Sequence, residues 1–410
     1  MIRHWFRLLW SRRRHNTAIV VEIATCFLVL CAVAALGLHQ LDKARIPTGY
    51  TIDDVYAVYV DYGSFYSMND DERAATRTQM ATLLDATRMQ PQVEAAAVAS
   101  NVPYLQSRWM SGIQFDGQRI KYIVGTATLE LRDVLGLEIT EGRWFDERDQ
   151  TAGPDNPVII SRSLARIFFG DESPIGKLVP RQDDDGNPVV REPGDPADRI
   201  IGVVDDYRWL GEYAPLHHTQ FRFTDLRGGI GDLSPFLLVR TAPGAGTDFE
   251  ERLLGSMRAT APAWEFRLRL LADYREQLHA QQLRLPIVGI VLAGFLVLMV
   301  GLGLVGVLWQ SVAQRTSEFG LRRALGSAAS GVRSLVLGEL MALATISALI
   351  GGLIFVQAPL LGIVTGLSTS VWIGAIALAA VVLYSFVLIC GLYPSWLATR
   401  IEPARALQYE

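Results

Sequence analysis

Hydrophobic residues gather into four long stretches of the chain, at about 17–38, 285–309, 335–356 and 371–393. Each stretch reaches the roughly 20 apolar residues that an α-helix needs to cross a hydrocarbon core about 30 Å thick. A hydrophilic region, 39–284, separates the first stretch from the other three. We therefore expect an α-helical membrane protein with four transmembrane helices and a large domain inserted between helices 1 and 2.

The first stretch has a second interpretation, as a secretory signal peptide. Arginines 12–14 precede it, and an Ala-Val-Ala triplet at 32–34 resembles a cleavage site. The apolar part of a signal peptide is only about 7–15 residues long, however, and this stretch is longer. An uncleaved anchor is therefore predicted, and a cleaved signal is the alternative.

The hydrophilic region alternates between strand-like and helix-like patterns, which predicts an α/β domain. Strand–helix–strand patterns occur at both of its ends, and Asp116-Gly117 predicts the turn of a hairpin between them. Both ends are expected to build one lobe, with a second lobe inserted at about 129–196. The expected strands are 55–61, 93–99, 113–118, 119–126, 199–204, 235–240 and 266–270, and the expected helices are 71–88 and 248–260.

A polar helical pattern at 272–285 runs into the second apolar stretch without a strong breaker. Pro286 lies at the junction, where it can kink a helix rather than end it. A continuous helix would link the hydrophilic domain mechanically to the membrane. Glycines recur just beyond, at 289, 294, 301, 303 and 306. They either permit close helix packing or reflect the general tolerance of membrane helices for glycine.

Basic residues indicate on which side of the membrane each connection lies. Those next to the spans fall in segments 3–14, 315–333 and 400–405, which share one side if four spans alternate. That side is the cytoplasm, and the uncharged connection 357–370 suits the opposite face. We expect both termini in the cytoplasm and the hydrophilic domain outside it.

The net charge of −4 over 410 residues conceals a polarised molecule. The hydrophilic region holds 27 Lys and Arg against 37 Asp and Glu, a charge of −10, whereas the remainder carries +6. Acidic residues outnumber basic ones overall, which excludes a nucleic-acid protein dominated by basic surface. All three cysteines lie in apolar stretches, so the hydrophilic region can form neither a disulfide nor a thiolate metal site.

The first residues, 1–16, interleave apolar side chains such as Trp5 and Phe6 with arginines. This pattern predicts an amphipathic helix that lies on the lipids of the inner membrane surface. A disordered, positively charged start is the alternative.

Two segments approach known binding motifs without satisfying them. Gly170 and Gly176-Lys177 resemble a phosphate loop, but five residues separate the glycines and Leu178 replaces the required Ser or Thr. The acidic run between Arg181 and Glu192 resembles a calcium loop, but arginine occupies the first ligand position. We expect a structural turn and a solvated acidic loop.

The pair His217-His218 has no third ligand at a suitable spacing, which favours surface histidines over a metal site. The sequence shows no Ser/His/Asp arrangement either. No catalytic, cofactor-binding or metal-binding residue is predicted.

Glu22 places a carboxylate inside the first apolar stretch, where a charge is costly and usually has a partner or faces water. It lies near the cytoplasmic end, so the neighbouring arginines can neutralise it. A functional contact with another helix is the alternative.

The connection between the second and third spans contains QRTSEFGLRRALGS at 314–327. Thr316 or Ser317 can cap a short helix there, and Gly326 can end it. A helix of mixed apolar and basic surface suits insertion into a groove on a cytosolic partner. An ordinary positively charged loop is the alternative.

This segment resembles the coupling element of FtsX-like or MacB-like permeases, the membrane subunits of lipoprotein-release, macrolide-exporter and cell-division ABC systems. The tail YPSWLATRIEPARAL at 393–407 resembles the closing motif of that family. The hydrophilic region resembles the family's periplasmic core domain, and the likeness covers nearly the whole chain. Its matching stretches are VLGL at 134–137, GRWF at 142–145, PVIIS at 157–161, FG at 169–170, PIGK at 174–177 and IGVVDD at 201–206. Two departures are a longer, more acidic loop at 181–198 and the lack of a fused ATPase domain.

The resemblance implies a non-catalytic permease subunit in a bacterial inner membrane, with a core domain at 39–284 and an FtsX-like part at 285–403. It implies a second, identical or related permease chain and two separate cytosolic ABC ATPase subunits, whose ATP hydrolysis moves the periplasmic domain. Export would then involve a possible periplasmic adaptor and outer-membrane duct. The residues expected to couple the permease to the ATPase are Ser317, Glu318, Phe319, Gly320, Arg322, Arg323, Ala324, Leu325 and Gly326. The alternative is a signalling protein that activates an envelope enzyme such as a cell-wall hydrolase.

Overall fold

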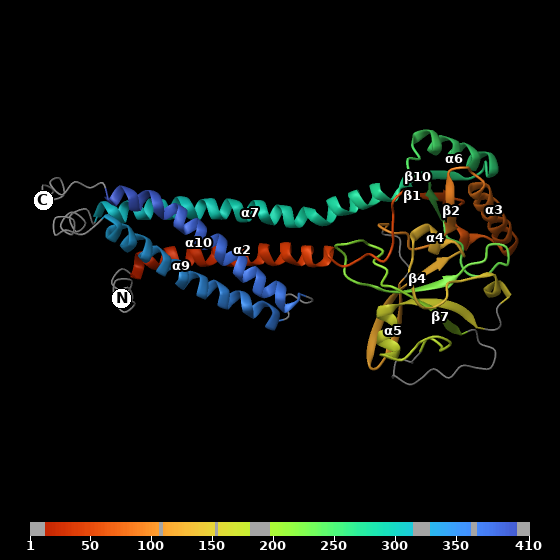
Figure 1. Ribbon diagram of the computed structural model, residues 1–410, viewed down its shortest axis with the longest axis horizontal. Coiled ribbons are helices and arrows are strands. Elements are labelled where there is room, and N and C mark those ends of the chain that lie inside the picture. Colours follow the sequence, from red (N-terminus) through yellow and green to blue (C-terminus); the bar gives the residue numbers. More distant parts are fainter. Residues whose placement is uncertain are drawn as a thin grey trace. The chain divides into compact units, whose positions relative to one another are not determined.

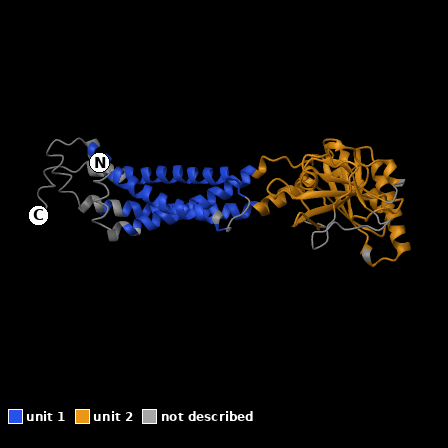
Figure 2. Ribbon diagram, turned by 90° about the horizontal axis from the view of Figure 1, so that it is seen from below, with its two compact units in different colours: residues 1–42, 283–410 blue, residues 43–282 orange. Residues whose placement is uncertain are grey.

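The computed structural model describes residues 13–105, 110–151, 155–180, 197–314, 329–361 and 367–399. The chain divides into two compact units (Figure 2). Residues 1–42 and 283–410 form the first, here called the membrane unit, and residues 43–282 form the second, here called the core domain. Each unit is built around its own hydrophobic core.

Four of the described helices are long and apolar enough to cross a membrane (Figure 1). They are α2 (Arg13–Ala44), α7 (Leu271–Gln314), α9 (Ala329–Leu360) and α10 (Thr369–Thr399). Each contains one of the predicted apolar stretches and extends beyond it. The prediction of four transmembrane helices around an inserted α/β domain is confirmed. Pro286 lies inside α7 and does not end it.

Glycines allow close packing at particular places in the membrane unit. A Cβ added to Gly301 of α7 would lie 2.4 Å from the Phe386 ring of α10, and one at Gly351 of α9 would lie 2.9 Å from the Ala24 carbonyl of α2. Gly294 and Gly306, by contrast, have no such atom within 4 Å. Close packing therefore accounts for some of the recurring glycines but not for all.

The first sheet of the core domain is antiparallel, with strand order β10-β1-β9-β2. Its strands come from both ends of the hydrophilic region, as the patterns predicted, and α3 and α6 pack on one face. The bounds are β1 (Val55–Asp61), β2 (Val93–Val98), β9 (Phe236–Thr241), β10 (Glu265–Leu270), α3 (Asp70–Arg88) and α6 (Thr247–Thr260).

Strand β1 is buried on both faces because its alternate side chains enter different cores. Tyr56, Val58 and Val60 pack in the cluster under α3 and α6, whereas Val55 and Ala57 join the cluster on the other face. Helix α3 begins at a capping box, in which Asn69 and Glu72 each accept a 2.9 Å hydrogen bond from the other's backbone N–H.

The second sheet has six strands in the order β3-β4-β8-β6-β7-β5 and mixes parallel with antiparallel pairs. Helix α5 covers one face, and α4 packs in the cluster on the other. Short 3-10 turns at Phe65–Ser67 (η1) and Glu147–Thr151 (η2) complete the description. The bounds are β3 (Met110–Phe115), β4 (Gln118–Ala127), α4 (Leu131–Leu135), β5 (Ile139–Gly142), β6 (Asn156–Ser161), α5 (Arg162–Phe169), β7 (Asp198–Val204) and β8 (His218–Phe223).

This sheet spans more sequence than the predicted lobe at 129–196, because its strands begin at Met110 and end at Phe223. The predicted hairpin belongs to it, and Asp116 and Gly117 form its turn with φ of +50° and +71°, as a type I′ turn requires. The lobe boundary was wrong because β4 pairs in parallel with β8, and local patterns do not reveal which distant strands pair.

Candidate functional site

The sequence-predicted coupling residues, Ser317 to Gly326, lie outside the described residues. So do most of the N-terminal segment 1–16 and the acidic loop from 181 to 196. The structure places α7 before the coupling segment and α9 after it. The assignment of these residues to ATPase coupling therefore stays a prediction.

Arg208 binds the carboxyl end of α2 within the core domain. The whole Arg208 residue is only 2% exposed, and its Nη1 donates to the carbonyl oxygens of Lys43 at 2.8 Å and Ile46 at 2.9 Å. Nη2 donates to the carbonyls of Glu212 at 2.6 Å and Ala214 at 2.7 Å. The last carbonyls of a helix have no intrahelical partner, and a cation there is favoured by the helix dipole. Burial lowers the pKa of Arg208 from its ordinary value, but an arginine keeps its proton in proteins.

Glu212, from the same loop, binds the beginning of α7. Its Oε2 accepts from His279 Nε2 at 2.7 Å, and its Oε1 accepts from the Tyr104 hydroxyl at 3.1 Å. Burial alone would raise the pKa of Glu212, but its backbone hydrogen bond and those from His279 and Tyr104 outweigh burial and lower it. The His279 ring also packs edge-on against Tyr213, with centroids 4.9 Å apart.

Residues 208–214, here called the clamp loop, thus contact both helices that leave the core domain toward the spans. Tyr50 adds a third contact, since its hydroxyl donates to the Arg208 carbonyl at 3.0 Å. Sequence reasoning missed this site. The loop begins two residues after the end of the IGVVDD stretch, yet an arginine among aromatic residues is no recognisable motif. Arg208 lies 165 residues from Lys43 in sequence, and Glu212 lies 67 residues from His279.

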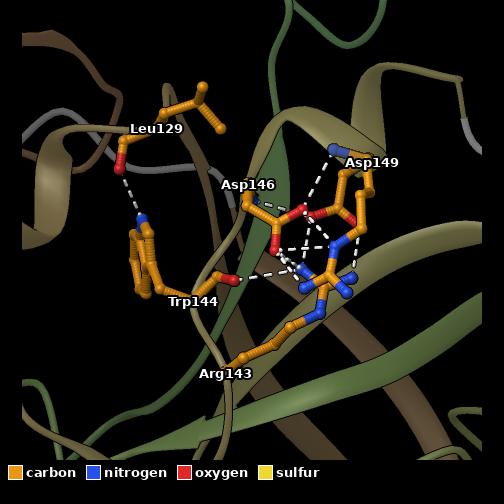
Figure 3. Close-up of polar contacts among 6 residues, drawn as sticks. Leu129, Arg143, Trp144, Asp146 and Asp149 are labelled. Atoms are coloured by element: carbon orange, nitrogen blue, oxygen red, sulfur yellow. Dashed lines mark hydrogen bonds and ion pairs between the residues drawn. The ribbon is translucent and has the colours of Figure 1, made fainter.

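The GRWF stretch at 142–145 forms a cluster of ion pairs and hydrogen bonds around Arg143, here called the Arg143 cluster (Figure 3). Arg143 makes a two-pronged ion pair with Asp149, at 2.6 and 2.7 Å, and the Asp149 side chain is only 6% exposed. Trp144 Nε1 donates to the Leu129 carbonyl at 2.7 Å. A Cβ at Gly142 would meet the Ile201 carbonyl at 2.3 Å. The arrangement fixes the chain after β5 against β7 and leaves its charges paired.

The two glycines of the near-miss phosphate loop lie in a structural turn, as expected. Gly170 ends α5, and the Gly176 amide donates to the Ile200 carbonyl at 2.8 Å. Lys177 pairs with Glu172 at 2.7 Å and lies over the Phe169 ring. Its ammonium group is therefore engaged by the turn itself.

The prediction of surface histidines is wrong, because His217 is half-buried and so is His218. The Nδ1 atom of His218 lies 2.8 Å from Ser163 Oγ, and burial lowers the pKa of His218. Ser163 N–H donates to Asp206 at 2.8 Å, so a serine, a histidine and an aspartate do meet here. The aspartate accepts from the serine backbone rather than from the imidazole, which differs from a catalytic triad. No group of three or more possible metal ligands occurs in the described part of the chain.

Glu22 lies against α7 in the membrane unit. A Cβ at Gly303 would come within 3.0 Å of Glu22 Oε1 and 3.4 Å of Oε2. The glycine therefore makes room for the carboxylate between two helices. This geometry favours a contact of Glu22 with another helix over the alternative, in which nearby arginines simply neutralise the carboxylate.

Known protein families match both units. The sequence matches the MacB-like periplasmic core domain over residues 17–253 and the FtsX-like permease C-terminal domain over residues 290–403. The chain belongs to the MacB-like family of ABC transporter permeases. Membership, together with the four helices that are long and apolar enough to cross a membrane, implies a multi-pass inner-membrane protein.

Several relatives illustrate the match. The chain is 27% identical over 291 residues to the uncharacterized ABC transporter permease YknZ of Bacillus subtilis, covering 68% of each. It is 24% identical over 401 residues to the macrolide export ATP-binding/permease protein MacB 2 of Aeromonas hydrophila, covering 93% of this chain and 56% of that protein. A Rhodopirellula baltica MacB is 35% identical over 127 residues, which are 30% of this chain and 18% of that protein. The chain thus spans about half or less of these MacB relatives.

Among solved structures, the core domain is similar to the periplasmic region of MacB from Actinobacillus actinomycetemcomitans. The TM-score is 0.35 at 14% identity, over 55% of this chain and 92% of that one. The extracellular domain of the YknZ transporter gives a TM-score of 0.32 at 15% identity, over 52% of this chain and 99% of that one.

Proposed function

We propose that this chain is the permease subunit of an ABC-type export system that transmits ATP-driven motion to its core domain. A separate cytosolic ATPase dimer hydrolyses ATP, and a second permease chain completes the assembly. Both chain termini lie in the cytoplasm and the core domain lies in the periplasm, where an adaptor and an outer-membrane duct receive the cargo.

One observation carries the proposal: both helices that join the two units are held by the core domain through the clamp loop. Helix α7 is one uninterrupted helix of 44 residues that starts directly after β10 and contains the second span. The end of α2 is held by Arg208, and the start of α7 by Glu212. A displacement of either helix along its axis is therefore passed to the domain rather than absorbed by a flexible linker.

On the cytoplasmic side, we assign the ATPase contact to the residues between α7 and α9. Phe319 and Leu325 supply apolar side chains that dock in a groove of the ATPase, while Glu318, Arg322 and Arg323 orient the short helix. Ser317, Gly320, Ala324 and Gly326 complete its caps and its close contacts.

The test is permease-dependent stimulation of ATP hydrolysis, measured with the partner ATPase and the full chain in nanodiscs. The double variant Phe319→Asp, Leu325→Asp should abolish stimulation, because buried carboxylates without partners oppose docking. Met89→Asp, at an exposed position of the core domain, is the matched control and should retain it. Full stimulation by the double variant would refute the proposed coupling role.

Co-purification distinguishes export from signalling. An adaptor and an outer-membrane duct captured with the full chain would support export. Capture of a cell-wall hydrolase in their place would assign the chain to the regulation of an envelope enzyme.

A further inference from the structure

A groove lies beside the clamp loop, within the core domain. It has a volume of about 320 Å³ and is lined by Tyr104, Leu105, Tyr274, Gln277, Leu278 and Gln281. The last four follow the spacing of one face of α7. The volume falls within the range of about 300–1,000 Å³ that is typical of small-molecule sites.

The lining is neutral, in a hydrophilic region whose net charge is −10. Leu105 and Tyr274 are half-buried and supply most of the apolar surface, since Tyr104 and Leu278 are only 4% and 6% exposed. The carboxamides of the exposed Gln277 and Gln281 supply hydrogen-bond donors and acceptors. Arg269 supports the rim from outside the lining: it lies over the Tyr274 ring and donates to Gln277 Oε1 at 2.8 Å. Because Arg269 occupies that oxygen, the amide NH₂ of Gln277 remains the group available to an acceptor.

Tyr104 is held in a strained conformation at the base of the groove. Its φ of +64° is left-handed, which is a genuine outlier for a bulky residue. The conformation is held by the Tyr104 amide, which donates to the Trp209 carbonyl at 2.6 Å, and by close contact of the ring with Gly211. Such strain is concentrated at functional sites such as ligand clamps.

The same tyrosine connects the groove to the clamp. Its hydroxyl and the His279 imidazole both bond to the Glu212 carboxylate, and the two rings pack edge-on with centroids 6.1 Å apart. A molecule in the groove therefore contacts Tyr104, whose hydrogen-bond partner Glu212 also binds His279 of α7.

We propose that this groove binds a neutral amphipathic small molecule bearing a carbonyl or hydroxyl group, as the export substrate or part of it. The apolar portion packs mainly against Leu105 and Tyr274, and the polar group accepts from the Gln277 and Gln281 amides. This assignment rests on the proposed export function and names the class of its substrate. No carboxylate lines the groove, which favours a neutral ligand over a cationic one.

The test uses benzophenone, a neutral diaryl ketone, with the full chain in nanodiscs. Under ultraviolet light its carbonyl oxygen abstracts a hydrogen atom from a nearby C–H bond, and the two resulting carbon radicals combine. Mass spectrometry of the peptides should show saturable labelling at Tyr104–Leu105 and at 274–281. The anionic analogue 4-benzoylbenzoate should label about five-fold less at equal concentration, because its charge is not compensated there.

Two variants make the outcome specific. Gln281→Trp fills the groove and should reduce its labelling about ten-fold, whereas Thr78→Trp, at an exposed position of α3, should not change it. Gln281→Glu nearly preserves the side-chain shape but removes an amide donor, and should reduce labelling about three-fold.

Labelling confined to the spans, or unchanged in Gln281→Trp, would overturn the assignment. A cross-link between the groove and a second copy of the chain would also overturn it and make the groove an interface. The labelling needs no ATPase, so its failure leaves the coupling test intact. Conversely, loss of the proposed coupling in that test does not alter groove labelling.

Discussion

Arg208 donates a 2.8 Å hydrogen bond to the carbonyl oxygen of Lys43, which lies 165 residues earlier in the chain and one residue before the end of α2. The contact ties the loop after β7 to the helix that contains the first span. It does so through backbone carbonyls, so the identity of the α2 side chains hardly matters to it. The contact requires the two Nη groups of the Arg208 guanidinium.

Arg208→Ala should therefore destabilise the core domain. The substitution removes the donor of the carbonyl oxygens of Ile46, Glu212 and Ala214 and leaves the Lys43 carbonyl with only the 3.2 Å bond from the Ile46 amide, at an expected cost of about 2–4 kcal/mol. Thermal unfolding of the full chain in detergent measures the loss. Arg227→Ala removes an arginine whose side chain is 73% exposed and should cost less than about 1 kcal/mol. Equal losses for the two variants would contradict the clamp.

The Glu212 pair should make stability depend on acidic pH. The pKa of Glu212 is lower in the folded protein than its ordinary value of 4.5, so its contribution is complete above that value and is lost as pH falls through the folded pKa. The melting temperature of the wild type should exceed that of Glu212→Gln at pH 7, and the difference should shrink below about pH 4.5. A difference that stays constant down to pH 3 would argue against a stabilising carboxylate.

Gly303→Leu should disturb the contact between α2 and α7, because even a Cβ at this position lies within 3.0 Å of the Glu22 carboxylate. We expect a loss of about 1–3 kcal/mol from overpacking, measured by thermal unfolding in detergent. Gly294→Leu is the matched control on the same helix, since no side-chain or neighbouring atom lies within 4 Å of its Cβ position. The double variant Gly303→Leu, Glu22→Ala should recover part of the lost stability. No recovery would mean that the added side chain clashes with a residue other than Glu22.

Asp149→Asn should weaken the Arg143 cluster shown in Figure 3, because Arg143 would lose a buried anionic partner. Breaking a buried pair costs about 3–5 kcal/mol, and the partial exposure of Arg143 places the expected loss near the lower end. Glu172→Gln removes a carboxylate whose side chain is 79% exposed and is the control, with a smaller expected loss of stability because exposed ion pairs contribute little. Matching unfolding temperatures for both variants would show that the Arg143 cluster contributes little to the stability of the core domain.

The local elements were largely predictable because each has a signal within its own residues. Strand β1 and helix α3 follow their patterns closely, and the Asp116-Gly117 turn follows from the two residues that tolerate positive φ. The four spans follow from length and hydropathy alone. The lobe boundary failed because the parallel pairing of β4 with β8 depends on residues about 100 positions apart.

The sequence by itself determined the class of the molecule: four apolar helices, an inserted α/β domain, and motifs that place it in the MacB-like permease family. These features depend on composition, periodicity and short contiguous segments, all of which are local. Only the tertiary structure decided that Arg208 and Glu212 hold the ends of α2 and α7, that Gly303 makes room for Glu22, and that Tyr104 lines a neutral groove. Those contacts join residues far apart in sequence, and their hydrogen bonds and packing exist only once the strands have paired and the helices have docked.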